Sequence, residues 1–393
     1  MKTYKFKLYQ AKKNKHLSDR LEIAGSIWNH CIALHRRYYK LTGKGLNAYA
    51  LMKHVAKLKK LPKYARWGLL DAQATQDIVQ RIARAYQLFF RNLKARPEGT
   101  RKAAPPGFKK VKKYKSFTLK QTGWKLLGSN KVRIQGVIYQ FFKSRNIVGM
   151  VKTVTVKRDK LGQFWLYFVT EQAENADQGR TTTETRTGQS VGFDFGLKTF
   201  LTGSDGTTIE APLFFRQHLN DVRRAYRQLS GKHKGGSNRH KANLHLNRVF
   251  QRIDHLRHDF FFKLAHALTD KYATIFWEDL NLKGMQALWG RKVSDLAFST
   301  FLHILQYVAS QKGVAVRLIE RFYPSSKTCS ACGHIYQALS LKDRHWACPG
   351  CGVLHDRDFN AALNIHRVGA STFGVGKVRL ACQRSPLIPE SHG

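Results

Sequence analysis

Acidic residues are scarce in this sequence, and long apolar stretches are absent from it. Against 69 Lys and Arg there are only 25 Asp and Glu, which gives a formal net charge of +44. Self-repulsion on this scale opposes compact folding unless a polyanion neutralises it, and solubility alone requires far less charge. No apolar run approaches the roughly 20 residues of a membrane-spanning helix. Attachment to a membrane surface is the alternative; a nucleic acid is the favoured partner.

The shortage of acids is uneven along the 393 residues. Only nine acidic residues precede Arg180, so we expect the N-terminal half to bind phosphates more strongly. The length allows one large core or two to three smaller ones. The segment "ENADQGRTTTETRTGQS" is polar, rich in Thr and free of aromatic residues, which predicts a linker and a domain boundary near residue 188.

Cysteines are also few, and four of the six form two C-x2-C pairs that are separated by fifteen residues. The four are Cys329, Cys332, Cys348 and Cys351. This spacing is typical of a four-cysteine zinc ribbon, in which four thiolates complete a tetrahedral shell with no open position. Such a site is structural. Two disulfides or an iron–sulfur cluster are the alternatives.

The other residues around these cysteines bear on the ligand set and the compartment. His334, His345 and His355 lie nearby, but four thiolates already satisfy zinc, so we expect none of the three to bind it. Cys31 falls on the apolar face of an expected helix, and Cys382 lies in the C-terminal tail. The start "MKTYKFKLYQ" is not a signal peptide, which together with metal-bound thiols indicates a reducing cytosol.

Hydrophobic periodicity gives a coarse structure. In the N-terminal half it predicts a strand over residues 2–9, helices over 16–42, 47–60 and 69–94, and β-like segments up to about 172. In the C-terminal half it predicts a hairpin over 190–210, helices over 216–271 that "GKHKGGSNRHK" interrupts, a strand at "YATIFWEDL", a helix near 294–312 and a strand at "AVRLIERF". A last helix is expected from Arg357, and the sequence after Val368 has little periodicity.

Asp194 stands in a strand-like segment, "VGFDFGL". The alternation puts the apolar residues on one side and Asp194 on the other, between Gly192 and Gly196. Asp is depleted in strands, and two glycines beside it predict open volume for a metal ion and a phosphodiester. A surface Asp without function is the alternative.

Two further acids follow from their positions. Glu278 ends an apolar strand, which is where α/β sheets place active sites; Asp279 beside it suits a cap of the next turn. On a helix from Arg357, Asp358 shares a face with Ala362 and Ile365, so the helix carries it toward the sheet.

Asp356 lies about 200° round that helix and suits its N-cap. Asp194, Glu278 and Asp358 are therefore the candidates for a two-metal phosphodiesterase site. Hard oxygen ligands favour Mg²⁺ or Mn²⁺, which about 3.5–4 Å apart activate a water and stabilise the leaving oxygen.

Five segments resemble, in order, the motifs of the TnpB family of transposon-encoded proteins, which are compact relatives of type V CRISPR effectors. They are "GFDFGL", "WEDLNLKGM", "RFYPSSKTCSACG", "CPGCG" and "HDRDFNAALNI". The resemblance covers residues 190–366, while "AYQLFFRNLK" and "PPGFKKVKKYKSF" resemble the family's N-terminal patterns. Residues 260–262, three phenylalanines, depart from a polar run in the family, and we expect a repacked core there.

The resemblance implies a multidomain fold, α+β and α/β. An N-terminal β-barrel-like wedge domain would carry a helical recognition insertion, and a C-terminal RNase H-like (RuvC) nuclease domain would carry the four-cysteine zinc ribbon. The implied ranges are 1–15 for the first wedge strand, 16–95 for the recognition domain, 96–175 for the wedge barrel, 176–189 for the linker, 190–325 for the first nuclease part, 326–354 for the zinc ribbon, 355–368 for the final nuclease helix and 369–393 for a tail without regular structure.

The resemblance also implies an RNA-guided DNA endonuclease with Asp194, Glu278 and Asp358 as its catalytic, Mg²⁺-binding acids. A guide RNA from the transposon end would direct it to double-stranded DNA beside a short adjacent motif, with Zn²⁺ in the ribbon. We expect a monomer in the RNA complex, no membrane partner, and the nucleoid-containing cytoplasm of a prokaryotic cell.

Residues that touch nucleic acid are harder to predict. We expect them on the polar face of the 69–94 helix, with Gln76 and Arg81 first, although such a face is often only solvated. The Lys-rich connection supplies four more candidates: Lys109, Lys110, Lys112 and Lys113. A nuclease-inactive guided repressor and a guide-independent transposase or resolvase are the alternative functions.

Overall fold

The computed structural model divides the chain into two compact units, Met1–Gln178 and Gly179–Gly393. The described residues are 1–95, 104–171, 189–280, 284, 290, 295–321, 323–340 and 342–374. The division falls inside the predicted linker 176–189, of which residues 176–188 lie outside the described part, as does Cys382. No helix within the described ranges has the length and apolarity to cross a membrane.

Unit 1 is built on two antiparallel sheets. The larger has the order β1 (Lys2–Lys7), β7 (Phe164–Glu171), β6 (Met150–Arg158) and β2 (Ser116–Leu119). The smaller has the order β3 (Trp124–Leu126), β4 (Lys131–Ile134) and β5 (Val137–Gln140). A bridge between Leu8 and Phe141 joins the end of β1 to the end of β5. The predicted strand over 2–9 is thus confirmed, and its alternation buries Tyr4 and Phe6.

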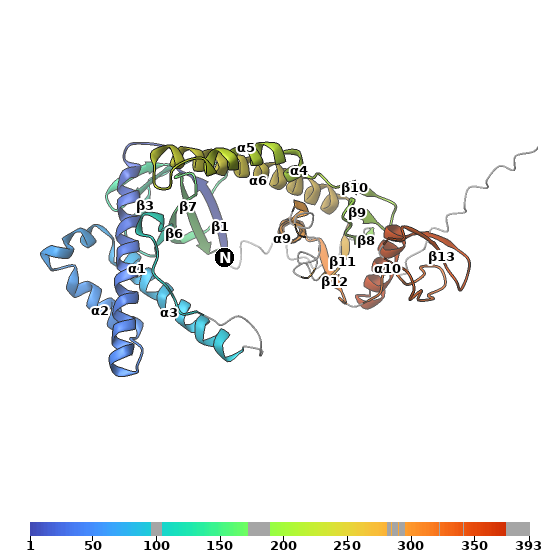
Figure 1. Ribbon diagram of the computed structural model, residues 1–393, viewed down its shortest axis with the longest axis horizontal. Coiled ribbons are helices and arrows are strands. Elements are labelled where there is room, and N and C mark those ends of the chain that lie inside the picture. The colour runs from blue at the N-terminus through green and yellow to red at the C-terminus, as the bar shows by residue number, and fades with distance from the viewer. Residues whose placement is uncertain are drawn as a thin grey trace, which may run out of the picture. The chain divides into compact units, whose positions relative to one another are not determined.

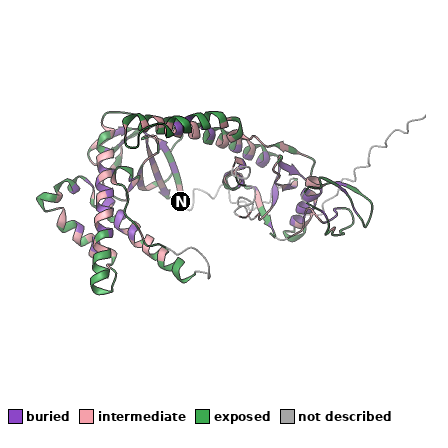
Figure 2. Cartoon of the chain, viewed as in Figure 1, coloured by how far each residue is buried: buried purple, intermediate pink, exposed green. Residues whose placement is uncertain are grey.

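The helices of unit 1 lie between β1 and β2 in the sequence (Figure 1). They are α1 (Asn14–Thr42), α2 (Ala48–Leu58), the 3-10 helix η1 (Pro62–Leu69), α3 (Ala72–Lys94) and the short 3-10 helix η2 (Val111–Lys113). The N-terminal part of α1 is buried, including Cys31, whereas its C-terminal end is exposed (Figure 2). The third helix begins at Ala72 rather than 69 because the Asp71 side chain caps it, accepting a hydrogen bond from Gln73 N.

Unit 2 contains a five-stranded sheet. Its order is β10 (Thr208–Glu210), β9 (Thr199–Gly203), β8 (Ser190–Asp194), β11 (Thr274–Glu278) and β12 (Ala315–Ile319). The strands β8, β11 and β12 are parallel, while β9 runs antiparallel to β8 and β10 antiparallel to β9. This is the sheet arrangement of the RNase H-like fold that the sequence resemblance implies.

Helices cover both faces of this sheet. The helices of unit 2 are α4 (Phe214–Gln217), α5 (Leu219–Ser230), α6 (Ser237–Lys271), α9 (Phe298–Lys312) and α10 (Arg357–Thr372). Phe193 and Trp277 join one core cluster with residues of α6 and α9, whereas Phe276 packs with Ile365 of α10. Of the three phenylalanines at 260–262, Phe261 is buried in the first cluster, Phe260 packs partly against it, and Phe262 is exposed; the expected repacking stays a prediction.

The last helix packs very closely on the sheet because glycines lie at the contact, Gly192 on β8 and Gly369 on α10. A Cβ added at Gly192 of β8 would stand 2.6 Å from the carbonyl oxygen of Ala362 in α10, and one at Gly369 would stand 2.9 Å from the Phe276 Cβ. The predicted end of this helix at 368 is wrong, since the helix continues to Thr372. Gly369 and Ala370 extend it because they pack against β11 and its neighbours.

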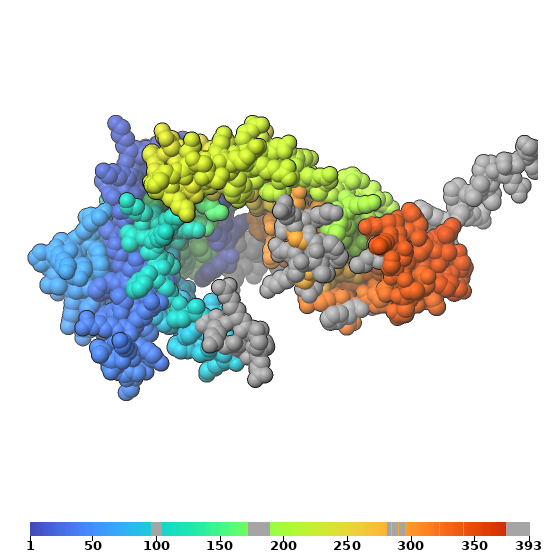
Figure 3. All heavy atoms as spheres, viewed as in Figure 1, coloured from blue at the N-terminus to red at the C-terminus, as the bar shows by residue number. Residues whose placement is uncertain are grey.

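The cysteine-bearing segment, residues 329–356, contains the four cysteines and leads directly into α10. Its second half forms a hairpin of β13 (His345–Ala347) and β14 (Leu354–Asp356), and α10 begins at the next residue, Arg357. Figure 3 shows the segment as an orange-red lobe at the edge of unit 2. The chain therefore returns from the cysteines straight into the helix that packs on β8.

Candidate active site and metal centre

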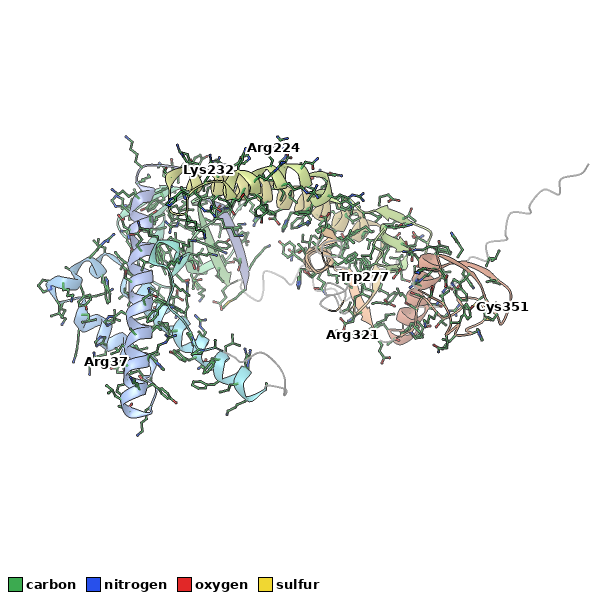
Figure 4. The ribbon with its side chains drawn as sticks, in the orientation of Figure 1. Arg37, Arg224, Lys232, Trp277, Arg321 and Cys351 are labelled. Atoms are coloured by element: carbon green, nitrogen blue, oxygen red, sulfur yellow. The ribbon has the colours of Figure 1, made fainter. Side chains whose placement is uncertain are left out.

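Two of the predicted acids lie next to each other at the edge of the sheet. The parallel pairing of β11 with β8 runs from Thr274 opposite Ser190 to Trp277 opposite Phe193, so the next residues, Glu278 and Asp194, adjoin. Neighbouring strands are about 4.8 Å apart. Because side chains alternate and Trp277 faces the core (Figure 4), both carboxylates face α10.

The first turn of α10 brings the third acid to the same edge. Asp356 is the N-cap, and its Oδ1 accepts a hydrogen bond of 2.8 Å from Phe359 N, which confirms the role predicted for it. Asp358 follows inside the helix, and Ala362 and Ile365 on its face are fully buried. A Cβ at Gly196, just past β8, would lie 3.8 Å from Asp358 Oδ2. The three acids therefore converge.

The carboxylates interact electrostatically. Burial, followed by the charges of Glu278 and Asp358, raises the pKa of Asp194 to about 8, while Arg357 and the Phe195 amide act in the opposite direction. Burial also raises the pKa of Glu278, and a hydrogen bond from Ser325 limits that rise. Without a metal ion, Asp194 thus holds a proton at neutral pH, and a divalent cation favours its release.

The sequence-based reason for an open site was wrong. We expected Gly192 and Gly196 to leave volume beside Asp194, but other backbone occupies the space beside both. The backbone of α10 fills the space beside Gly192, and a Cβ at Gly196 would stand 2.5 Å from the Thr199 carbonyl oxygen. The glycines bring α10 and the β8–β9 turn close to the sheet, and through that closeness they set the position of Asp358.

Sequence reasoning missed two residues that hold these acids. Arg344 Nη1 lies 3.3 Å from Asp358 Oδ1 and 3.4 Å from Oδ2, and the Ser325 hydroxyl donates a hydrogen bond to Glu278 Oε1. Arg344 lies within the cysteine-bearing segment and Ser325 lies just before it. No hydrophobic periodicity marks either residue. Asp279, by contrast, forms an ion pair with Arg321 (2.5 Å).

The four cysteines form the candidate metal centre. Their sulfurs lie within 4.8 Å of one another, with Cys329 Sγ 3.7 Å from Cys351 Sγ and Cys332 Sγ 3.6 Å from Cys348 Sγ. A tetrahedral zinc with Zn–S bonds of about 2.3 Å requires sulfurs about 3.8 Å apart, so the set fits. All four are free cysteines, which argues against the two-disulfide alternative.

Backbone amides and one histidine surround the sulfurs. The Cys332 amide donates to Cys329 Sγ at 3.5 Å and the Gly350 amide to Cys348 Sγ at 3.4 Å, as expected for turns of this kind. The sulfur group within the described residues includes none of the three nearby histidines. The buried His355 instead places Nε2 3.0 Å from Cys329 Sγ, which suits a hydrogen bond that orients the ligand.

The candidates for nucleic-acid contact on α3 differ in their surroundings. Gln76 is exposed. Arg81 forms an ion pair with the buried Asp77 (2.7 Å) and donates to Ser116 O and Thr118 Oγ1, both at 2.9 Å. Its placement gives Arg81 the role of joining α3 to β2, which does not favour the predicted contact with nucleic acid. The i, i+4 spacing from Asp77 is the one signal of this role in the sequence.

The four lysine candidates of the Lys-rich connection also differ in their surroundings. Lys109 places Nζ 3.3 Å from the centre of the Trp28 ring, a cation–π contact that fixes its side chain. All four lysines are exposed, so the difference lies in the ring contact of Lys109. Lys110, Lys112 and Lys113 are available for contacts with phosphates.

Two family models match the chain. The model described as "Cas12f1-like, TNB domain" matches residues 298–365, which include all four cysteines, and the model described as "Probable transposase" (OrfB_IS605) matches residues 167–288. The two matches contain the three acids between them.

Curated relatives and a solved structure are also similar. The "Putative RNA-guided DNA endonuclease" of Streptomyces pristinaespiralis is 34% identical over 57% of this chain and 54% of that protein. The "Putative RNA-guided DNA endonuclease InsQ" of Escherichia coli (strain K12) is 26% identical over 78% of this chain and 77% of that protein. The chain thus spans about half the length of the first of these relatives. The "Cryo-EM structure of the Cas12f1-sgRNA-target DNA complex" shares the fold, with a TM-score of 0.52, 16% identity, and coverage of 91% of this chain and 83% of that one.

Proposed function

The chain belongs to the TnpB family, and on that premise we propose that it is an RNA-guided, metal-dependent DNA endonuclease that cleaves target DNA beside a short adjacent motif. One observation carries the proposal. Asp194 and Glu278 end adjacent parallel strands on one face, and α10 places Asp358 beside them. Three converging carboxylates at one edge of an RNase H-like sheet suit phosphodiester hydrolysis at a single RuvC-type site.

The three carboxylates would hold Mg²⁺ or Mn²⁺, since oxygen donors suit these ions. Two such ions, when bound, would supply an activated water and neutralise the leaving oxygen. The chain's own part is to keep the carboxylates in position. Ser325 supports Glu278 in this role, and Arg357 limits the rise in the pKa of Asp194 that burial causes. Asp358, which pairs with Arg344 in this structure, would give up that ion pair to hold a bound cation.

The four cysteines would hold a structural Zn²⁺. Because β14 continues into α10 at Arg357, a folded cysteine segment fixes the start of the helix that carries Asp358. A zinc bound there would therefore support cleavage by fixing the position of α10, without contact with the substrate. The fit of the sulfur distances to a tetrahedral shell supports this assignment.

The proposed partners are a guide RNA from the transposon end and double-stranded DNA. The net charge of +44 suits the two phosphate backbones, and base pairing by the guide would supply the sequence specificity. The exposed Lys110, Lys112 and Lys113 are proposed phosphate contacts, and Gln76 a contact with the adjacent motif. We propose a monomer in the RNA complex and a place in the nucleoid of a prokaryotic cell.

The test uses the full chain purified with the RNA that accompanies it. That RNA is sequenced, and DNA that matches it is offered with Mg²⁺. Asp194→Ala should lower the rate of cleavage by about 10³-fold or more while guided DNA binding stays close to that of the unmodified chain. Asp279→Asn is the matched control, because this neighbouring acid pairs with Arg321 outside the site, and it should cleave normally.

The same assay separates the alternatives. A guided repressor would bind the matched DNA without cutting it under any divalent metal. A guide-independent transposase or resolvase would keep its activity after ribonuclease treatment of the preparation, whereas the proposed enzyme loses it. Full cleavage by Asp194→Ala would overturn the assignment of the site.

A further inference from the structure

The loop of residues 325–330, which runs into the first cysteine pair, is held by two asparagines of α10. Asn360 and Asn364 are 1% and 0% exposed, which is rare for this residue type. Asn364 Nδ2 donates to the carbonyl oxygens of Ser325 (2.8 Å) and Thr328 (2.6 Å). Asn360 Nδ2 donates to the Thr328 oxygen (2.8 Å), and its Oδ1 accepts from the Ser330 amide (2.8 Å). We call this set of contacts the asparagine clamp.

The loop joins the two candidate metal sites. At its start, the Ser325 hydroxyl donates to Glu278 Oε1. At its end, Ser330 follows the cysteine ligand Cys329 and also accepts a hydrogen bond from Arg367 of α10 through its carbonyl oxygen. The loop therefore contacts the Glu278 carboxylate through Ser325 and contains the candidate zinc ligand Cys329. Between these two residues, Thr328 binds it to α10, the helix that carries Asp358.

We propose that Ser325 is a positioning residue for Glu278, and that the asparagine clamp makes the placement of Glu278 depend on the folded cysteine segment. The inference rests on the proposed function, because it treats Glu278 as a ligand of the divalent ion. It goes beyond that function by assigning roles to residues that touch neither metal nor nucleic acid.

The physical argument concerns the freedom of the carboxylate. Glu278 ends its strand, and a long side chain at that place samples several rotamers. The hydrogen bond from Ser325 occupies one lone pair of Oε1 and fixes the plane of the carboxylate, leaving Oε2 and the remaining lone pair of Oε1 for a cation. Partners that orient metal ligands in this way are worth about 10- to 100-fold in metal affinity.

The clamp keeps Ser325 itself in place. Buried amide-to-carbonyl hydrogen bonds are costly to leave unmade, so the loop is held rigidly against α10. A merely structural clamp would stabilise the loop and leave divalent-ion affinity unchanged. The two roles are therefore separable by measurement.

The first experiment tests Ser325 on the full chain without RNA. Mn²⁺ binding is followed by electron paramagnetic resonance of the free ion, and bound zinc by elemental analysis. Ser325→Ala should weaken Mn²⁺ binding by about 10- to 100-fold and keep its zinc. Ser325→Thr retains the hydroxyl and should restore binding. Ser371→Ala, which removes an exposed hydroxyl that donates to Val368 O within its own helix, is the control.

The second experiment tests the clamp. Asn360→Ala removes the contacts with Thr328 O and Ser330 N and a longer one with Ser325 O (3.5 Å), so it should release zinc to a chelator about tenfold faster and also weaken Mn²⁺ binding. Asn364→Ala, which leaves the Ser330 contact intact, should weaken Mn²⁺ binding with little effect on zinc. Asn247→Ala on α6, which removes a hydrogen bond from Asn247 Nδ2 to Asn243 O within that helix, is the control. Unchanged Mn²⁺ affinity in Ser325→Ala or in Asn364→Ala would overturn the proposal.

Failure of the inference is distinguishable from failure of the proposed function. If the unmodified chain with its RNA does not cleave matched DNA, the proposed function fails, whereas Mn²⁺ binding still reports on Ser325 and the clamp. If cleavage occurs, the Mg²⁺ concentration for half-maximal rate should rise about 10- to 100-fold in Ser325→Ala, with a maximal rate close to that of the unmodified chain. A fall in maximal rate alone would contradict a positioning role.

Discussion

The cysteine cluster and the carboxylate site both offer ligands to metal ions, but the protein holds the two sets in different ways. Neighbouring sulfurs already have the spacing of a tetrahedral shell, and tight local turns hold each pair, with Gly333 N bonded to Cys329 O and Gly352 N to Cys348 O. The carboxylates come from two strands and a helix. In the part of the chain that the structure describes, they form no group as tight as the sulfurs.

Charge explains the difference. Thiols can remain neutral until a metal binds them, so four can gather without repulsion. Three carboxylates at one place repel one another; this repulsion adds to the burial that raises the pKa of Asp194, and Asp358 pairs with Arg344. The cysteine cluster is therefore a local structure that, on the proposed function, a bound metal would stabilise, whereas the carboxylate site is a tertiary structure that a bound metal would allow to become fully charged.

Loss of a cysteine ligand should have a larger effect on metal binding and cleavage than any other substitution that tests this comparison. Cys348→Ser should abolish stoichiometric zinc binding, because it removes one of the four thiolate ligands. Structural zinc contributes about 10–16 kcal/mol to the folding of small metal-bound segments, so the fold of this segment should be lost with it. The cysteine segment should become sensitive to proteases, and DNA cleavage should fall with it. Cys31→Ala is the control, since this buried cysteine lies in the core of unit 1 and should keep zinc. Stoichiometric zinc in Cys348→Ser, measured by elemental analysis, would contradict the cluster.

The local character of the cysteine cluster explains why sequence could predict it. The C-x2-C spacing, the cap at Asp356 and the inward face of Asp358 all depend on residues within a turn or two of each other. The alternation around Asp194 is equally local, and the structure confirms which residues face the core. Periodicity carries this information because the geometry of each turn or strand repeats along the chain.

The supports of the carboxylate site depend on contacts between distant residues, and sequence could not predict them. Gly192 meets a helix about 170 residues later in the chain, so its small size was taken for open space. Arg344 and Ser325 find their partners only when the cysteine segment folds back onto the sheet. Arg81 was expected at the surface because its contacts with β2, thirty-five residues on, leave no local pattern.

A methyl group between helix and sheet tests how much the carboxylate site depends on tertiary packing. Gly192→Ala should destabilise unit 2 by about 3 kcal/mol or more, because the added Cβ would stand 2.6 Å from one backbone atom of α10 and 2.8 Å from another. The helix must move outward and take Asp358 with it, so cleavage should fall while zinc stays bound. Gly68→Ala, with nothing within 4 Å of its Cβ, should change the melting temperature little. An unchanged calorimetric transition of unit 2 would contradict the packing.

The pH dependence of divalent-ion binding tests the charge of the carboxylate site. A folded-state pKa of about 8 for Asp194 means that the metal-free protein holds a proton there between the ordinary pKa of 3.8 and about 8. A bound cation displaces that proton, so Mn²⁺ affinity should rise about tenfold per pH unit up to about pH 8 and then level off. Titrations at pH 6, 7 and 8 measure this slope.

The same proton has a consequence for stability. Because the folded state binds it and the unfolded state does not, its contribution to metal-free stability is present at low pH and is lost as pH rises through about 8. Asp194→Asn should remove this trend in the melting temperature, whereas Asp279→Asn should keep it. A melting temperature of the unmodified metal-free protein that rises from pH 5 to pH 8 no less steeply than that of Asp194→Asn would contradict a raised pKa of Asp194.

The smallest expected effect concerns Arg344, which joins the two regions. The guanidinium is 43% exposed and lies 3.3 Å from Asp358, so its loss should cost the metal-free protein no more than about 1 kcal/mol. Arg344→Gln should lower the melting temperature slightly at low salt and less at high salt, and bound Mg²⁺ should remove the difference because the cation replaces the guanidinium. Lys342→Gln in the same segment is the control. If Arg344→Gln remained destabilised with saturating Mg²⁺, Arg344 would be part of the fold of the cysteine segment instead of a counter-charge to the carboxylates.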